Sequence, residues 1–316
     1  MEEESISFFG PFWIDALVYG CLFALMAMGC TLIYMTTRIP NFAHGSFVTV
    51  GAYMAFTLNY FVGLSPYHAA LPAFFLGGAL AIFMYKVILK PLRNRRSSLV
   101  TLMIATFAID IGFQGIFGIY SDMLTNLYLI ADSKYFLLGN TDISLLGMKG
   151  LIFICPISLA GITMALWLVL TRTKFGIAMR AAVENPNLAG TLGINVERVY
   201  VVSWFISGGL ACLAGTYVVL WLPGSPHVGS DLLISMFAAS VLGGLFSVFG
   251  AVIGGLMVGG GEVLLTVYAS RLLGSWVSVW QSGVPMLIFA VTLLIVPQGV
   301  TSVKWDHVIL WLRRRK

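Results

Sequence analysis

Runs of apolar residues recur along the chain, and most of them are long enough to cross a lipid bilayer as a helix. A crossing needs ~20 residues, because a helix rises 1.5 Å per residue. The 316 residues are only 10% charged, whereas soluble domains are roughly a quarter charged. The sequence therefore predicts an all-α, polytopic integral membrane protein, and it excludes a soluble enzyme, a disordered tail and a nucleic-acid binder. The predicted spans are residues 12–35, 42–62, 67–89, 98–120, 150–171, 199–222, 232–246, 249–268 and 282–299.

The number of spans is eight or nine within a single transmembrane domain, residues 1–316. Residues 232–246 and 249–268 are short, rich in glycine and separated by only two residues. They are either two tight crossings or one broken, re-entrant element. The second span follows Pro40, which cannot extend the preceding helix, and we expect Asn41 to cap the new one.

The basic residues predict the orientation. Fifteen of the 18 lysines and arginines fall in three clusters or at Arg38. Nine crossings with the N-terminus outside and the C-terminus in the cytoplasm would place all fifteen inside, as the positive-inside rule requires. The longest external connection is then 121–149, and the longest cytoplasmic one is 172–198. The clusters are Lys86, Lys90, Arg93, Arg95 and Arg96; Arg172, Lys174, Arg180 and Arg198; and Lys304 with Arg313, Arg314, Arg315 and Lys316. The acidic residues left outside are Glu2, Glu3, Glu4, Asp122, Asp132, Asp142 and Asp231.

Sequence motifs of catalysis are missing from this chain. There is no nucleophile elbow, no zinc-protease helix and no phosphate-binding Gly-Lys motif. The four cysteines are scattered singly, which predicts neither a disulfide framework nor a metal site. A protein of this kind that uses nucleotide energy must take it from another chain.

Glycines and one polar turn are candidates for a gate or a solute path. Gly243 and Gly244 begin a stretch in which glycines recur at spacings of four. Such spacings let helices approach closely, so the stretch is either a solute-lining gate or a packing seam. His44 either faces the pathway or makes a helix-end hydrogen bond, and Gly45 and Gly51 allow a helix or a solute to come close.

Two carboxylates fall inside predicted spans, where ionisable groups are costly. Asp110 lies near the middle of the fourth span and Glu262 lies in the eighth. Either one lines the solute path, binds a solute ammonium group or carries a proton. The alternative is a hydrogen-bonded carboxyl group that holds helices together.

The cytoplasmic loop is much longer than a plain helix connection needs. Pro186 suits the first turn of a short helix capped by Asn185, and Gly193 suits its end. We expect this helix to present a docking surface. Its apolar positions are Leu188, Ala189 and Leu192.

Four motifs, in order, resemble the ABC importer permeases for branched-chain amino acids. The loop from Arg180 to Ile194 resembles the family's coupling loop, and the resemblance extends over residues 12–303. The short N-terminus resembles the H-type rather than the M-type permease. The other motifs are Asn41-Phe42-Ala43-His44-Gly45 with Gly51-Ala52-Tyr53, the glycine-rich stretch 241–255 with Glu262 after it, and Pro297-Gln298-Gly299.

The resemblance implies a non-enzymatic pore subunit in a prokaryotic inner cell membrane. Its partners would be an M-type permease, two ATP-binding subunits and an extracytoplasmic solute-binding protein. This chain would bind no cofactor, since ATP and Mg would sit on the partners. The coupling residues would be Arg180, Glu184, Asn185, Pro186, Ala189, Gly193 and Ile194. The pathway or gate candidates are Asn41, His44, Gly45, Gly51, Asp110, Gly243, Gly244 and Glu262.

Other functions remain open at this point. A proton- or sodium-coupled secondary transporter would use Asp110 and Glu262 directly, and a passive channel would use the small-residue seam as its lining. A permease of the same family for urea or amides is a further alternative. The first two leave the long cytoplasmic loop without a role, so the importer is the preferred interpretation.

Overall fold

The fold was analysed in a computed structural model that describes residues 12–296 and 299–302. Three sequence features lie outside these residues: the acidic N-terminal start, Pro297-Gln298 of the closing motif, and the C-terminal basic cluster.

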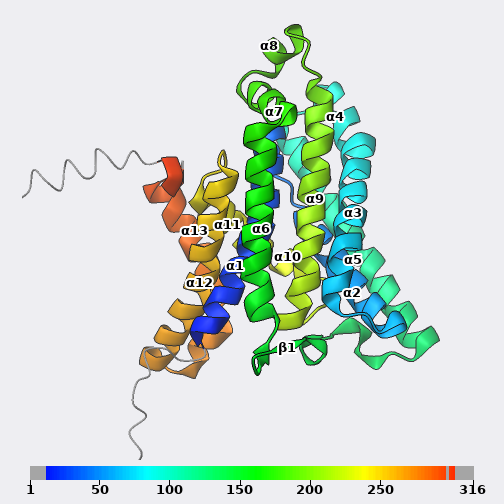
Figure 1. The fold of residues 1–316 in the computed structure, drawn as a ribbon, viewed down its shortest axis with the longest axis vertical. Coiled ribbons are helices and arrows are strands. Elements are labelled where there is room, and N and C mark those ends of the chain that lie inside the picture. Colours follow the sequence, from blue (N-terminus) through cyan, green and yellow to red (C-terminus); the bar gives the residue numbers. More distant parts are fainter. Residues whose placement is uncertain (1–11, 297–298, 303–316) are drawn as a thin grey trace, which may run out of the picture.

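The described residues form a helical bundle with one small hairpin (Figure 1). The helices are α1 (Phe12–Thr37), α2 (His44–Val62), α3 (Pro66–Met84), α4 (Lys90–Asn94), α5 (Leu99–Tyr128), α6 (Leu151–Arg172), α7 (Lys174–Glu184), α8 (Pro186–Thr191), α9 (Val196–Trp221), α10 (Val228–Asp231), α11 (Leu233–Gly243), α12 (Val248–Leu273) and α13 (Gly283–Ile295). A π-helical turn (Tyr85–Leu89) joins α3 to α4, and short 3-10 turns cover Ala131–Lys134, Gly139–Thr141, Ser275–Trp280 and Val300–Ser302. The antiparallel strands are β1 (Ser144–Leu145) and β2 (Met148–Lys149).

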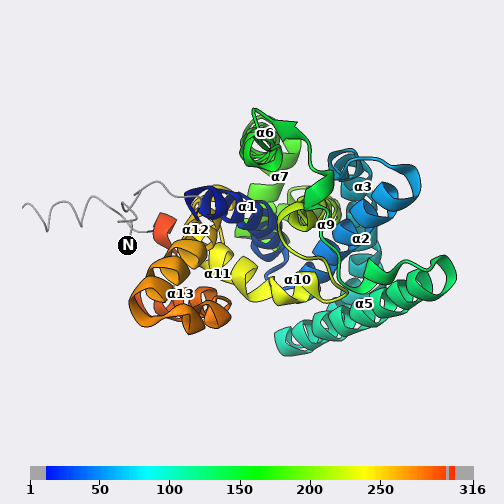
Figure 2. The ribbon, with the colours of Figure 1, turned by 90° about the horizontal axis from the view of Figure 1, so that it is seen from below.

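Helices α1, α2 and α9 form the centre of the bundle (Figure 2). Helix α1 is apolar on all sides and 89% of its most apolar window is buried, as expected of a helix surrounded by protein. It packs against α12 and α9, while α9 also packs against α2 and α3. Small residues make these contacts close: a Cβ atom on Gly215 of α9 would overlap the Val48 carbonyl of α2.

Helices α5 and α6 lie at the periphery of the bundle (Figure 2), and their most apolar windows are each only 17% buried. Their exposed side chains are nevertheless apolar, among them Ile104, Ile119 and Ile157. In water such faces would be unfavourable, whereas hydrocarbon solvates them well. This pattern confirms a polytopic helical membrane protein.

Six helices of the described chain are long and apolar enough to cross a membrane: α1, the α3–α4 rod, α5, α6, α9 and α12. Helix α2 falls outside this group, and α11 and α13 are shorter apolar helices. All nine predicted spans correspond to helical segments, but the count of eight or nine crossings stays a prediction. Helix α11, with 11 residues, would reach only ~16 Å.

The two long hydrophilic segments lie at opposite ends of the bundle (Figure 1). Both are more ordered than the sequence suggested. Helix α5 continues to Tyr128, so the predicted external segment 121–149 begins as helix and then forms the hairpin. The predicted loop 172–198 consists largely of α7 and α8, of which only α8 was expected.

Two helices begin partway along the bundle rather than at one of its ends. Residues 38–43 are not helical, and α2 starts at His44 instead of residue 42. Asn41 does not cap it: the N-cap position is Ala43, two residues later, and Asn41 Oδ1 accepts a hydrogen bond from Ala43 N at 3.2 Å. On the other side, α10 lies about midway along α6 and α9 (Figure 1), and the placement of Asp231 on the external side stays a prediction.

Candidate functional site

The turn between α7 and α8 is built as the sequence predicts. Asn185 Oδ1 accepts hydrogen bonds from the backbone N–H groups of Asn187 and Leu188, at 3.1 and 3.0 Å, and so caps α8. Pro186 occupies the first turn, where no N–H is needed. Gly193 has a φ of +82°, and Ile194 N closes the helix on Ala189 O at 3.0 Å.

Helix α8 presents an apolar surface at the end of the bundle. Ala189 is buried against the rest of the chain, whereas Leu188 and Leu192 are 57% and 73% exposed. Glu184 is exposed at the end of α7. Arg180 is also exposed, but its guanidinium donates a hydrogen bond to the Leu170 carbonyl of α6. Part of its hydrogen-bonding capacity is therefore used inside the chain.

Ion pairs and hydrogen bonds join helices at the end of the bundle where α7 and α8 lie. Glu197, in the first turn of α9, lies 2.8 Å from Lys90 Nζ and 3.6 Å from Arg93 Nη2. Tyr85 donates a further hydrogen bond to the same carboxylate at 3.2 Å. Arg38, just after α1, donates to Val183 O of α7 at 3.3 Å. These contacts join α7 to the end of α1, and α4 to the start of α9.

The two internal helix starts, those of α2 and α10, meet in the middle of the bundle. A Cβ atom on Gly45 would overlap the Gly229 backbone, and a Cβ atom on Gly229 would overlap that of Gly45. The Gly229 N–H donates to Thr49 Oγ1 at 3.1 Å. Only glycine fits at this crossing, so these two discontinuous segments are held in direct backbone contact.

His44 and Asn41 are both buried beside this crossing. His44 Nε2 donates to the Met26 carbonyl of α1 at 3.1 Å, so the expected helix-end hydrogen bond is replaced by one between two helices. The Nδ1 atom of His44 and the Nδ2 atom of Asn41 are buried with no hydrogen-bond partner among the described residues. Polar atoms left in this way are suited to a ligand or a water.

Asp110 lies at the same level on α5 and is 2% exposed. Ser46 donates to its Oδ1 at 2.5 Å, Gln114 donates to its Oδ2 at 2.8 Å, and Ser230 bridges both oxygens at 3.1 and 3.0 Å. The sequence reasoning missed these three donors. Of the three, only Gln114 could have been found from the sequence, because a residue four positions after Asp110 lies on the same face of a helix.

The glycine candidates make close helix contacts. A Cβ atom on Gly51 would overlap the Cys212 carbonyl of α9, and one on Gly243 would overlap Gly250 of α12. Gly244, with a φ of +105°, forms the turn between α11 and α12. The last two glycines therefore shape a tight helical hairpin and lie apart from the Asp110 cluster.

Glu262 belongs to a separate place in the fold, on α12. It is 6% exposed, and Gln281 Nε2 donates to its Oε1 at 3.2 Å. Its Oε2 is buried without a hydrogen-bond partner in the described chain. The structure thus brings Asn41, His44, Gly45 and Asp110 together, and it places Glu262 elsewhere.

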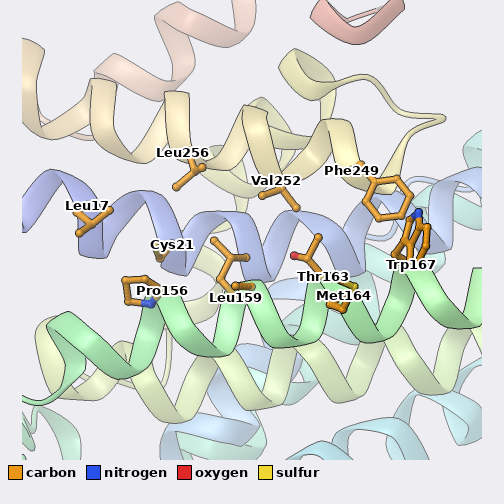
Figure 3. A pocket seen from close by; sticks show the side chains of 11 residues that line it. Leu17, Cys21, Pro156, Leu159, Thr163, Met164, Trp167, Phe249, Val252 and Leu256 are labelled. Atoms are coloured by element: carbon orange, nitrogen blue, oxygen red, sulfur yellow. The ribbon is translucent and has the colours of Figure 1, made fainter.

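An apolar groove of about 610 Å³ runs between α1, α6 and α12 (Figure 3). Leu17, Leu159, Met164, Trp167 and Leu256 are among the side chains that line it. Such walls offer no partner to a charged solute. The groove is therefore not part of the candidate solute site.

A polytopic helical bundle with a buried polar crossing and an exposed, capped short helix at one end is the architecture expected of a membrane permease. Residues 12–296 match the family model described as branched-chain amino acid transport system / permease component, and the chain belongs to this family.

Three named relatives illustrate the relationship. The chain is 42% identical to the probable branched-chain amino acid transport permease protein LivH of Methanocaldococcus jannaschii, over 92% of this chain and 91% of the relative. It is 26% identical to the high-affinity LivH of Escherichia coli over 94% and 97% of the two chains. It is 28% identical to BraD of Pseudomonas aeruginosa over 79% and 83%. No solved structure matches the chain.

Proposed function

We propose that this chain is one half of the transmembrane pore of an ATP-driven importer for branched-chain amino acids. The observation that supports this most strongly is the capped turn at Asn185, with the exposed apolar α8 beyond it, in a chain of the permease family. A passive channel or a secondary transporter has no need of such a docking element. LivH and BraD, the relatives above, are named for branched-chain amino acid transport.

In this proposal α8 docks on an ATP-binding subunit in the cytoplasm. ATP and Mg would be held by two such subunits, while a second, M-type permease would complete the pore. A solute-binding protein would deliver the amino acid from outside, across the prokaryotic inner membrane. The N-terminus would lie outside and the C-terminus inside, after nine crossings.

The geometry gives a route from the docking element to the solute path. Closure of the ATP-binding subunits would displace α8 and α7 together. Arg38 joins α7 to the end of α1, α7 and α8 both pack against α9, and α9 packs directly against α2. Rocking of these helices would open the middle of the bundle alternately to each side. The candidate path residues near the crossing of α2 and α10 are Asn41, His44, Gly45, Gly51 and Asp110. The other candidates, on α11, on α12 and in the turn between them, are Gly243, Gly244 and Glu262.

The proposal is tested by the ATPase activity of the assembled transporter in lipid nanodiscs. The chain is co-purified with the subunits encoded beside it, and the solute-binding protein is added with and without leucine. We expect leucine to stimulate ATP hydrolysis. Failure of any ATP-binding subunit to co-purify, together with solute flux that follows a proton or sodium gradient, would overturn the importer proposal.

A further inference from the structure

Asp110 is a buried carboxylate whose three hydrogen-bond donors are all neutral. Two are hydroxyl groups, from Ser46 of α2 and Ser230 of α10, and the third is the amide of Gln114. Within residues 12–296 and 299–302, no lysine or arginine forms an ion pair with Asp110. The described chain therefore supplies this carboxyl group with hydrogen bonds but with no cationic partner.

Asp110 lies away from both ends of a helix that is long and apolar enough to cross a membrane, where a carboxylate without a cationic partner is costly. Asp110 lies on α5, eleven residues from its start and eighteen from its end. The first turn of α2 supplies only partial positive charge, roughly half an elementary charge at a helix start. Ionisable groups at this depth usually face a water-filled cavity or carry a function. A monovalent positive group would be the natural partner of an ionised carboxylate at this position.

A chain of hydrogen bonds leads from the carboxylate through Gln114 to the surface of the described chain. Gln114 Oε1 accepts a hydrogen bond from Nδ1 of His227 at 2.9 Å, and His227 is exposed. Asp231, in the same segment, is exposed as well. Seen along the bundle, α10 lies at one edge of the molecule, between α11 and α5 (Figure 2). Lipid would not solvate such side chains, which favours a water-filled passage along this edge.

We infer that the Asp110 cluster binds the primary ammonium group of the transported amino acid. An ammonium group carries one positive charge and three N–H donors. The cluster can offer it the Asp110 carboxylate, the Ser230 hydroxyl oxygen and, after rotation of its amide, Gln114 Oε1. This inference rests on the proposed function. A proton or a sodium ion is the competing source of the same positive charge.

The decisive variants are Asp110→Asn and Asp110→Glu, with Thr106→Val as the matched control. Thr106 lies one turn away on the same face of α5 and accepts a hydrogen bond from Phe42 N at 3.1 Å, but it carries no charge. Uptake of leucine is measured in proteoliposomes that contain the complete transporter. We expect Asp110→Asn to lower uptake at least tenfold, while Asp110→Glu and Thr106→Val keep most of it.

A second set of conditions separates the ammonium group from an inorganic ion. Wild-type uptake is measured with sodium replaced by choline and with the proton gradient collapsed by an ionophore, and it should stay unchanged. Full activity of Asp110→Asn would overturn the inference. So would a wild-type sodium or proton dependence that disappears in Asp110→Asn.

A binding measurement tests the inference even where transport fails. The purified complex is heated with 10 mM butylammonium chloride or with the same concentration of sodium chloride. Butylammonium should raise the unfolding midpoint of the wild type and not that of Asp110→Asn. Equal shifts in the two proteins would contradict the ammonium site. Absence of ATP-driven uptake by the wild type would contradict only the proposed function.

Discussion

The backbones of Gly45 and Gly229 touch in the middle of the bundle, where neither residue has room for a Cβ atom. This contact joins the start of α2 to α10, so two discontinuous segments meet beside Asp110. We expect Gly45→Ala to destabilise the protein by about 1–3 kcal/mol, since added volume must displace backbone. The measurement is the midpoint of thermal unfolding in detergent. Gly161→Ala is the control, because nothing lies within 4 Å of that Cβ and α6 should tolerate it.

The end of α8 depends on a backbone conformation that only glycine adopts readily. Gly193 has a φ of +82°, while Gly190 in the same short helix has an ordinary φ and equally open surroundings. Gly193→Ala should cost about 1–2 kcal/mol of local stability and distort α8. We expect leucine-stimulated ATP hydrolysis to fall severalfold in Gly193→Ala and to persist in Gly190→Ala. Equal activities would show that the helix end does not matter for coupling.

The hydrogen bond of His44 holds α2 against α1. His44→Phe keeps a ring of similar size but removes the donor to the Met26 carbonyl, at a cost of about 1 kcal/mol. His44→Gln retains an N–H donor and should lie between the wild type and His44→Phe in thermal stability. Wild-type stability of His44→Phe would mean that this hydrogen bond contributes nothing.

At the end of the bundle where the hairpin lies, Asp142 connects α3 to the start of α6 through two hydrogen bonds. Tyr67 donates a hydrogen bond to its Oδ1 at 2.6 Å, and Leu151 N donates to its Oδ2 at 3.2 Å. Tyr67→Phe should therefore lower stability by about 1.5 kcal/mol, toward the lower end of the range for bonds to charged groups. Tyr60→Phe alters an exposed ring and serves as the control. A smaller loss in Tyr67→Phe than in Tyr60→Phe would contradict the assignment.

Much of this architecture follows from the sequence because membranes impose simple rules. Each of the nine spans predicted from apolar runs corresponds to a helical segment. The capping residue Asn185, with Pro186 and Gly193, correctly predicted α8. Such features depend only on neighbours in the chain.

The features that the sequence did not predict depend on tertiary contacts. The bond from His44 to Met26 requires α1 to lie alongside α2, and the donors of Asp110 come from three helices. Helix α7 was missed because a basic, amphipathic segment between two spans resembles a loop when only hydropathy is considered. The late start of α2 goes with the burial of Ile39, Asn41 and Ala43 before it, which no capping rule contains.

In the proposed function, the hydrolysis of ATP, rather than an ion gradient, drives transport through this chain. The most direct measurement is leucine accumulation in proteoliposomes that contain the complete transporter and the solute-binding protein, with ionophores that abolish proton and sodium gradients. We expect accumulation that requires ATP and Mg and is unaffected by the ionophores. Accumulation that continues without ATP and stops when the gradients are collapsed would contradict it.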